Sequence, residues 1–249
     1  MAPLSRLQLG INKRKFFMTK TRRVAVLQSS YIPWKGYFDI IHDVDTFVFY
    51  DDVQFTRQDW RSRNRVIANG RPTWLTVPAG TDIKRLINEV ELSDSSWQGK
   101  HWSTIRHAYS KSPFFRDLAP AVEDFYMGQA WKSLSHMNQH FIKFISGDVL
   151  GLDTEFVDST VFEAKGSKLD RLIDLLKKVG ATHYLSGPSA RSYIDPVRFA
   201  DAGVSLEYMN YDRYPEYPQS SDTFEHGVSV LDLLFNVGPS APDYIWGKR

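Results

Sequence analysis

Residues 24–39 read Val-Ala-Val-Leu-Gln-Ser-Ser-Tyr-Ile-Pro-Trp-Lys-Gly-Tyr-Phe-Asp, and this stretch decides the fold class. The apolar run at residues 24–27 is typical of a short buried strand, and a helical pattern begins near Trp34. In α/β proteins the corner between a strand and the next helix is a natural ligand site. The corner here is rich in polar and aromatic side chains: Gln28, Tyr31, Trp34, Lys35 and Tyr37. We therefore predict a small-molecule site at this corner.

Short β-like runs alternate with helical patterns along the rest of the chain. Strands are predicted at residues 24–28, 46–50, 73–77, 154–157, 183–186 and 205–209. Helices are predicted at residues 35–42, 97–110, 114–128, 131–150, 168–179, 196–202 and 228–235. This alternation favours an α/β fold with a doubly wound, mostly parallel sheet. The consecutive helices break the alternation and predict a helical insertion around residues 97–150.

The length of the chain suits one domain with an elaboration. It has 249 residues, of which 42% are hydrophobic, enough to bury a core. Residues 1–23 contain seven Lys and Arg side chains and no acid, and we predict a disordered basic tail there. Residues 24–249 are predicted to form a single α/β domain that includes the helical insertion.

Composition excludes several function classes. No window approaches the roughly 18 consecutive apolar residues of a membrane span, so we expect no transmembrane segment. The chain has no Cys, which rules out disulfides and thiolate nucleophiles and fits a reducing cytoplasm. Beyond the tail, acidic residues outnumber basic ones, so general nucleic-acid binding is not expected. The glycine-rich fingerprints of P-loop and dinucleotide-binding proteins and the hydrolase elbow are missing.

A run of arginines suggests anion recognition. Arg61, Arg63 and Arg65 alternate, so on a strand they share one face. A guanidinium fork suits a phosphate or carboxylate, as in a nucleotide or nucleotide-sugar. Trp60 and Asn64 add recognition chemistry to this segment. The alternative is a solvated strand face whose arginines pair with nearby aspartates.

Few residues are candidates for acid–base chemistry. Asp51 and Asp52 follow an apolar run at a predicted strand end, and adjacent strand residues point in opposite directions. We favour Asp52 as the one that faces the site, as a general base, a ligand of Mg²⁺ or a partner of a substrate amine. The alternative is the common use of Asp in turns and caps. His101 is a second candidate base. His136 and His140 lie four apart but lack a third ligand, so no metal site is predicted.

Two later segments have the composition of ligand loops. Ser186 and Gly187 follow a predicted strand, where a glycine lets backbone N–H groups approach an anion; a plain strand-to-helix turn explains them equally well. Tyr211, Tyr214 and Tyr217 lie in a loop rich in tyrosine and proline. Their rings suit stacking on a sugar or base, or packing at an interface.

A set of motifs between Val24 and Pro239 carries a family resemblance. They are QSSYIPWKGYFD, YDDVQFTRQDWRSRN, WLTVPA, KHWSTIRHAYSKSPFF, YLSGPSARSYID, YPEYPQ and SVLDLLFNVGP. On these motifs the chain resembles the WbqC-like protein family, found among bacterial proteins of O-antigen and lipopolysaccharide biosynthesis. The motifs span nearly the whole chain except the basic tail, and they are specific as a set.

The resemblance implies a transferase. It suggests transfer of an amino acid, proposed as glycine, or of a similar acyl group to an amino sugar. The partner is then a small-molecule substrate, a nucleotide-linked or lipid-linked sugar. The matching motifs imply these site residues: Gln28, Tyr31, Trp34, Lys35, Asp52, Arg61, Asn64, His101, Lys111, Ser186 and Tyr217. Arg213 stands where a His is expected in relatives.

Three hypotheses follow. In the first, an aminoacyl- or acyltransferase acts on a nucleotide-linked amino sugar, with Asp52 or His101 as base, Arg61 and Arg65 clamping phosphate, and Lys35 stabilising the oxyanion. The second is an ATP- or nucleotide-dependent transferase or ligase that resembles nucleotidylyltransferases, whose His-x-Gly-His signature is absent here. The third is a non-catalytic sugar- or nucleotide-binding protein. The sequence leaves the need for a cofactor open.

Overall fold

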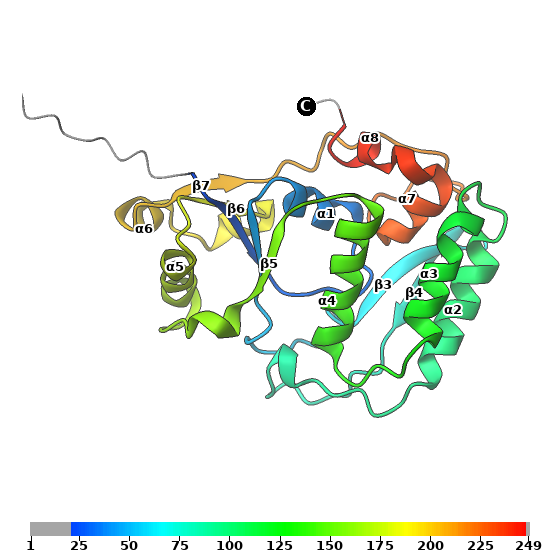
Figure 1. Cartoon of the computed structure of the whole chain (residues 1–249), viewed down its shortest axis with the longest axis horizontal. Coiled ribbons are helices and arrows are strands. Elements are labelled where there is room, and N and C mark those ends of the chain that lie inside the picture. Colours follow the sequence, from blue (N-terminus) through cyan, green and yellow to red (C-terminus); the bar gives the residue numbers. More distant parts are fainter. Residues whose placement is uncertain (1–20, 248–249) are drawn as a thin grey trace, which may run out of the picture.

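A five-stranded parallel sheet forms the centre of the molecule. The computed structural model describes residues 21–247. The strands are β1 (Arg23–Leu27), β2 (Thr46–Phe49), β5 (Glu155–Asp158), β6 (His183–Ser186) and β7 (Ser205–Tyr208). Their spatial order is β5-β2-β1-β6-β7, and every neighbouring pair is parallel (Figure 1). The chain first builds outward from β1 through β2 to β5, and then returns to add β6 on the other side of β1.

Helices cover both faces of this sheet, which confirms the doubly wound α/β fold. Val24 and Val26 of β1 point towards α5 (Lys168–Val179) and α6 (Pro196–Asp201), where a smaller apolar core forms. Ala25, between them, faces the larger core, as strand alternation requires. The larger core includes α1 (Lys35–His42), α4 (Leu134–Phe144), α7 (Val230–Val237) and α8 (Ala241–Ile245).

The predicted helical insertion lies between β4 and β5. It contains α2 (Ser96–Tyr109), α3 (Phe115–Met127) and α4, and Figure 1 shows α2 and α3 at the opposite end of the molecule from α5 and α6. The sequence pattern predicted one helix over residues 131–150. Instead, α4 begins at Leu134, with Ser133 as its cap, and continues after Phe144 as a π-helical turn, Ile145–Val149.

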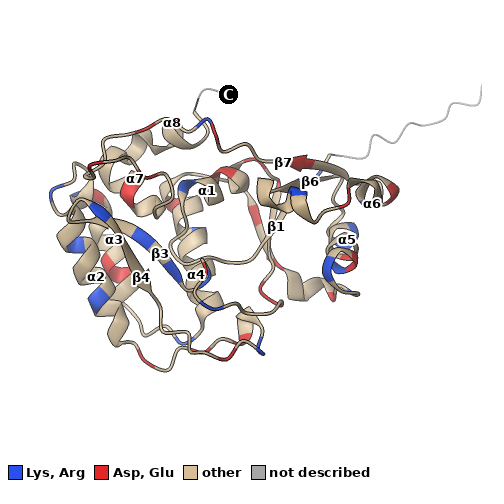
Figure 2. Ribbon diagram, turned by 180° about the vertical axis from the view of Figure 1, so that it is seen from behind, with Lys and Arg blue, Asp and Glu red and all other residues tan. Residues whose placement is uncertain are grey.

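A separate antiparallel hairpin precedes the insertion. It consists of β3 (Arg63–Ala68) and β4 (Arg71–Thr76), joined by Asn69 and Gly70, both with positive φ. Two-residue turns of this kind match the twist of a hairpin and favour Asn-Gly. Strand alternation turns Asn64 and Val66 inward, while Arg63 and Arg65 share the other face. Figure 2 shows basic residues, in blue, along β3.

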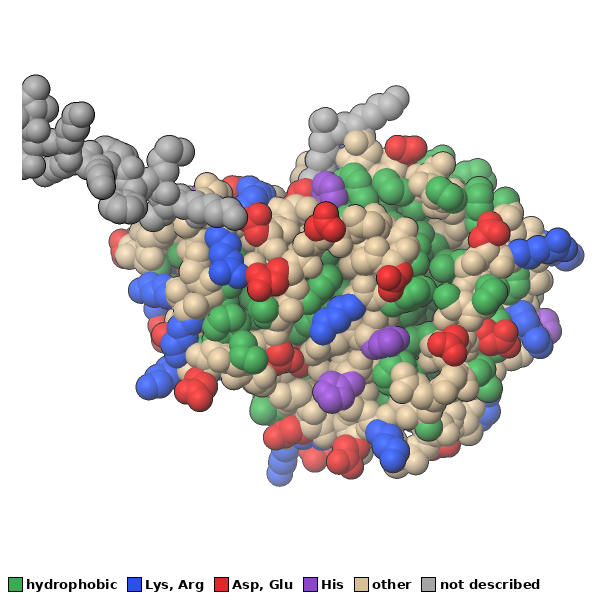
Figure 3. Space-filling model, in the orientation of Figure 1, with side chains coloured by type: hydrophobic (Ala, Val, Ile, Leu, Met, Phe, Trp, Pro, Cys, Tyr) green, Lys and Arg blue, Asp and Glu red, His purple; other side chains and the backbone are tan. Residues whose placement is uncertain are grey.

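The remaining features are short or peripheral. Single 3-10 turns lie at Ile87–Glu89, Ser159–Phe162, Pro188–Ser192 and Gly238–Ser240. Most of the predicted basic tail lies outside the described residues, but Arg23 opens β1 and Arg22 pairs with Glu155 at 2.8 Å. Acidic and basic side chains are interspersed on the face seen in Figure 3. Within residues 21–247, no helix has the length and apolar character needed to cross a membrane.

Candidate functional site

Polar side chains gather where the parallel strands end. Gln28 follows β1, Asp51 and Asp52 lie just beyond β2, Ser159 follows β5, and Ser186 ends β6. Because the strands are parallel, these residues belong to one edge of the sheet. The strand order reverses between β1 and β6, and in open α/β sheets ligands bind beyond the strand ends at such a reversal. The predicted corner after β1 therefore lies at the position that the topology favours for a ligand.

Gln28 and Arg61, predicted separately, are in contact at this corner. An Nη of Arg61 donates a hydrogen bond to Oε1 of Gln28. Asp59 accepts from the Arg61 backbone N–H at 2.9 Å and lies 3.4 Å from its Nε. Asn138 of α4 donates to the carbonyl of Arg61 at 2.8 Å. The guanidinium is thus positioned from several sides, and 17% of the Arg61 side chain remains exposed.

The loop after β1 is fixed by buried amides and carboxylates. Asn64 Nδ2 donates to the carbonyls of Tyr31 and Ile32 at 3.2 and 2.9 Å. Ile32 has a φ of 35°, a left-handed conformation that is costly for a β-branched residue. Asp51 accepts from the backbone N–H of Ser29 at 2.8 Å. Asn64 and Asp51 are both buried, and their hydrogen bonds to the backbone hold the loop in this conformation.

Lys35 stands in the first turn of α1, just beyond this loop, and only 2% of the residue is exposed. Its Nζ donates to the carbonyl of Pro215 at 3.3 Å. The same Nζ lies 4.8, 5.3 and 5.8 Å from the ring centres of Tyr214, Tyr217 and Phe224. Burial lowers the pKa of Lys35 from 10.5 to about 8, although the negative charge of Asp232 opposes this shift. A substantial fraction of this amine is therefore neutral near physiological pH.

Asp232 on α7 is the centre of a buried network beside Lys35. Its carboxylate accepts hydrogen bonds from Tyr109 at 2.9 Å, Tyr217 at 2.6 Å and Gln219 at 2.6 Å. Burial raises the pKa of Asp232, while these three donors act in the opposite direction. The network links α2, α7 and the loop that covers Lys35. It fixes Tyr217, one of the three rings around the amine.

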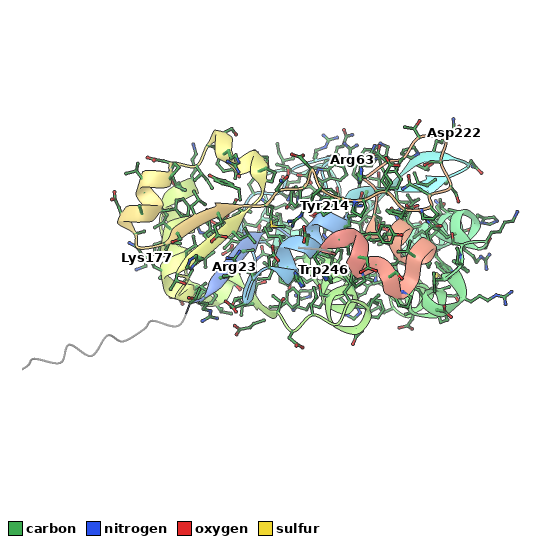
Figure 4. The ribbon with its side chains drawn as sticks, turned by 90° about the horizontal axis from the view of Figure 1, so that it is seen from above. Arg23, Arg63, Lys177, Tyr214, Asp222 and Trp246 are labelled. Atoms are coloured by element: carbon green, nitrogen blue, oxygen red, sulfur yellow. The ribbon has the colours of Figure 1, made fainter. Side chains whose placement is uncertain are left out.

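Aromatic side chains close the other side of the Lys35 environment. The ring of Trp34 lies 5.0 Å from Tyr211 and 5.8 Å from Tyr214, both nearly perpendicular to it. Figure 4 shows Tyr214 over α1, and its hydroxyl donates to buried Asp39 at 2.7 Å. A Cβ at Gly36 would lie 2.3 Å from a Trp34 ring carbon, so this packing requires glycine there.

Asp52, the base favoured from the sequence, is an ion-pair residue. Its Oδ2 lies 2.5 Å from an Nη of Arg171 on α5, and its Oδ1 accepts from Ser159 at 2.5 Å. Asp51 is fully buried and also accepts from Ser135 at 2.5 Å and from Gln139 at 3.1 Å. Both carboxylates thus have close partners at the strand edge.

His101, the second candidate base, lies inside the core. Its Nδ1 is 2.7 Å from the hydroxyl of Tyr31, which is 2.5 Å from the hydroxyl of Tyr126. Burial lowers the pKa of His101 to about 4, although a hydrogen bond to the backbone of Thr76 acts in the opposite direction. His101 is therefore neutral at physiological pH. Tyr31 is itself completely buried, so the pair braces α2 against the loop after β1.

The outward face of the hairpin carries exposed rings and guanidinium groups. Trp60 and Trp74 are 45% and 44% exposed, and their ring centres lie 5.6 Å apart. The guanidinium of Arg63 lies 4.2 Å from the centre of the Trp74 ring. Arg65 pairs with Glu225 at 3.1 Å and donates to the Gly227 carbonyl at 2.9 Å. Arg65 thus fixes the loop near Lys35.

The remaining predicted residues are separated. Ser186 is buried and donates to the Tyr184 hydroxyl at 3.3 Å. Lys111 lies apart from the β1 corner, on a cavity between α2 and the hairpin turn. Arg213 lies 3.6 Å from buried Asp39.

One group in the described part of the chain offers metal-ligand geometry. Asp39, His42 and Asp43 each place one ligand atom within 4.8 Å of the others. Asp39 already accepts from Tyr214 and pairs with Arg213, and His42 stacks on Trp246 at 4.3 Å. The group is thus engaged in contacts within the protein.

The sequence prediction missed three residues around the Lys35 amine: Asp232, Phe224 and Pro215. Asp232 left a detectable signal, because it is a single charged residue within the apolar run Val230–Val237. A buried carboxylate in such a run needs partners. Its partners Tyr217 and Gln219 lie in the Tyr- and Pro-rich loop that the sequence did single out.

Comparison with known proteins agrees with the motifs. The model of the WbqC-like protein family matches residues 28–244. The chain belongs to the WbqC-like family. The chain is also 39% identical over 226 residues to "Uncharacterized protein Rv1507c" of Mycobacterium tuberculosis (strain ATCC 25618 / H37Rv), covering 90% of this chain and 97% of that protein. No solved structure matches significantly. The family match includes the β1 corner, Lys35 and Asp232.

Proposed function

We propose that the protein transfers an aminoacyl or related acyl group to the amine of a nucleotide-linked amino sugar, in the cytoplasmic steps of bacterial surface-polysaccharide biosynthesis. The observation that carries the proposal is Lys35. It is a buried amine with a pKa of about 8, in the first turn of the helix that follows β1. A catalytic base works best when its pKa lies near the working pH, and burial of lysine is one way to achieve this.

The reaction needs a proton acceptor. The amino sugar arrives as an ammonium ion and must lose a proton before its nitrogen can attack the donor carbonyl. Neutral Lys35 accepts this proton, and the nitrogen attacks the donor carbonyl to form the C–N bond. The C–O or C–S bond of the donor then breaks with its electron pair on the departing oxygen or sulfur, which takes the second proton of the nitrogen. No covalent enzyme intermediate is needed, which suits a chain without cysteine.

The contacts of the other candidates favour Lys35 in this role. Asp52 is paired with Arg171, and protonating it would cost that ion pair. His101 is surrounded by Tyr31, Trp97 and Tyr126 in the core. Within residues 21–247, by contrast, the Lys35 amine donates one hydrogen bond, to the carbonyl of Pro215. The loop that holds this carbonyl contains no helix or strand between Tyr208 and Val230. Access of a substrate to the amine requires this loop to move away from the contacts that Tyr214 and Tyr217 make with Asp39 and Asp232.

The nucleotide is assigned to the corner beside Lys35. The guanidinium of Arg61 suits a diphosphate, and Gln28 fixes it there. The turn after β6, Gly187 and the 3-10 helix Pro188–Ser192, lies at the strand-order reversal and suits the remainder of the nucleotide. Trp34 and Tyr211 suit stacking of the sugar.

A second candidate function is an ATP-dependent ligase. The sheet order favours it, because β1 lies at the centre with strands added on each side in turn, as in nucleotide-binding α/β folds. Such an enzyme would activate the acid with ATP and Mg²⁺ and release pyrophosphate. The two functions share the amine-acylation step but differ in the donor.

The decisive experiment is a product assay by mass spectrometry. UDP-, dTDP- and GDP-linked amino sugars are incubated with three donors: aminoacyl-tRNA, an aminoacyl thioester, and free amino acids with ATP and Mg²⁺. We expect an acylated amino sugar with the wild type and none with Lys35→Met or Lys35→Arg, because neither accepts a proton near neutral pH. Lys143→Met is the matched control, since Lys143 is an exposed lysine 5.4 Å from the Phe49 ring centre.

The product assay, together with a thermal-shift screen, distinguishes the transferase, the ligase and the binding protein. Product from ATP and Mg²⁺ alone selects the ligase. Stabilisation by a nucleotide amino sugar in a thermal-shift screen without product from any donor would leave a binding protein. Full activity of Lys35→Met would remove Lys35 from the chemistry.

A further inference from the structure

We propose that a second ligand site, for a sugar bearing a phosphate or carboxylate, lies between the β3–β4 turn and α2. This inference does not depend on the proposed transfer reaction. It starts from a cavity of about 660 Å³, within the size range of small-molecule sites. Figure 1 shows α2 beside the hairpin. Both elements line the cavity, together with Asn236 of α7 and Ser220.

One face of α2 contributes to the lining of this cavity. Ser103, His107 and Lys111 lie four residues apart and so recur on the same side of the helix and its C-terminal extension. The turn residues Asn69 and Gly70 also line the cavity. The wall is therefore mainly hydroxyl, amide and imidazole groups. Such groups match the alternating donors and acceptors of a polyhydroxylated ligand.

The orientation of two of these groups is fixed by the protein. Nδ1 of His107 lies 2.7 Å from the carbonyl of Ser103, which can only accept, so Nδ1 carries a proton and donates it to this carbonyl. Asn236 donates through Nδ2 to the carbonyl of Asp232 at 2.8 Å, and its Oδ1 accepts from Ser112 at 3.3 Å. Polar groups held in this way are pre-organised for a ligand.

The charge of the lining favours an anion. Lys111 is exposed and has no ion-pair partner within residues 21–247. None of the described residues that line the cavity is acidic. An unpaired ammonium among hydroxyl groups suits a sugar phosphate or a uronic acid, and it does not suit an apolar chain.

The cavity also lies close to the Lys35 environment. Asn236 is one turn beyond Asp232 on α7, and Ser220 follows Gln219, which donates to Asp232 at 2.6 Å. The two sites are thus separated by the Asp232 network. This explains why Lys111, although in a family motif, is not at the β1 corner.

Calorimetry with defined probes tests the proposal. The probes are glucose, galactose, mannose and N-acetylglucosamine 1-phosphates, glucuronic and galacturonic acids, the neutral methyl glycosides, and inorganic phosphate. We expect at least one anionic sugar to bind, and Lys111→Gln to weaken it roughly 10- to 150-fold, as loss of a charged hydrogen bond does. Ser103→Trp, which fills the cavity, abolishes binding. Lys100→Gln, on the exposed surface of the same helix, and Lys35→Met leave it unchanged.

Other outcomes overturn the proposal. These are no binding of any anionic sugar up to about 10 mM, binding that survives both Lys111→Gln and Ser103→Trp, or inorganic phosphate binding as tightly as every sugar. If Lys35→Met lowers the affinity for the probe as much as Lys111→Gln does, the probe binds at the proposed transfer site instead.

Discussion

The ammonium of Lys35 lies 4.8 Å from the centre of the Tyr214 ring, and the hydroxyl of that tyrosine donates to Asp39 one turn further along α1. One side chain from the Tyr- and Pro-rich loop therefore covers two buried charged residues of the same helix. In Figure 4 the loop runs from the labelled Tyr214 over α1 out to Asp222 at the periphery. This arrangement keeps the lysine amine away from water, and that burial lowers its pKa.

Replacement of Lys35 should change how stability depends on alkaline pH. Between pH 8 and 10.5 the unfolded chain keeps the Lys35 proton while the folded protein releases it, so the free energy of unfolding rises with pH. Relative to Lys35→Met, the wild type should gain up to about 3 kcal/mol across this window. Urea unfolding at several pH values measures the difference. The exposed Lys143→Met control should show the wild-type slope, and an equal slope in Lys35→Met would refute the lowered pKa.

Replacement of Asp232 should lower both the stability of the protein and the pKa of Lys35. Two oxygens of Asp232 accept three hydrogen bonds, and in Asp232→Asn one of these oxygens becomes a donor. At least one buried donor then lacks a partner, which costs about 1–3 kcal/mol. Thermal unfolding tests this, with the exposed Asp243→Asn as control. The pKa of Lys35 should also fall further, since the Asp232 charge raises it. An unchanged melting temperature would contradict the network.

His101 should make the protein sensitive to acid. Its folded pKa is about 4 and its ordinary value 6.5, so between these values the unfolded chain binds a proton that the folded protein does not. The contribution of neutral His101 to the free energy of unfolding is therefore fully present above pH 6.5. It falls by up to about 3 kcal/mol as the pH drops towards 4. Circular dichroism during acid unfolding should show a lower midpoint pH for His101→Gln. The matched control is His107→Gln, an exposed histidine of the same helix, which should behave as wild type.

Arg61 should contribute to binding of a nucleotide-linked sugar. Loss of one charged hydrogen bond costs about 1.5–3 kcal/mol, so Arg61→Ala should raise Kd roughly 10- to 150-fold in calorimetry. Arg57→Ala removes an exposed arginine from the same segment and should have little effect. If the two variants lose affinity equally, the loss reflects the net charge of the segment and not a specific contact. If Arg61→Ala binds as tightly as the wild type, Arg61 is not in the site.

Local patterns were sufficient to predict the sheet and most helices. Residues 24–27 and 46–49 are short apolar runs in the central strands, and α5 has a clear apolar stripe that ends at Gly180. The hairpin was incomplete in the prediction, although Asn69-Gly70 is a strong turn signal. The first strand of the hairpin, Arg63–Ala68, was missed because it begins with alternating charged residues on its outward face and lacks a continuous apolar run.

The site was harder to predict because it depends on distant contacts. Residue type and motif indicated Lys35, but its lowered pKa arises from loop residues about 180 positions later in the chain, such as Pro215. The sequence favoured Asp52 as the base and assigned Lys35 to the oxyanion, and only tertiary structure pairs Asp52 with Arg171. Burial and ion pairing, rather than residue identity, separate these two candidates.

The most direct test of the central claim is an NMR titration of the Lys35 side chain, assigned with Lys35→Arg, with and without a nucleotide-linked amino sugar. We predict a pKa of about 8 in the free protein and a clear change in the Lys35 signal when the ligand binds. A pKa near 10.5, with a Lys35 signal that no nucleotide-linked amino sugar perturbs, would contradict the account.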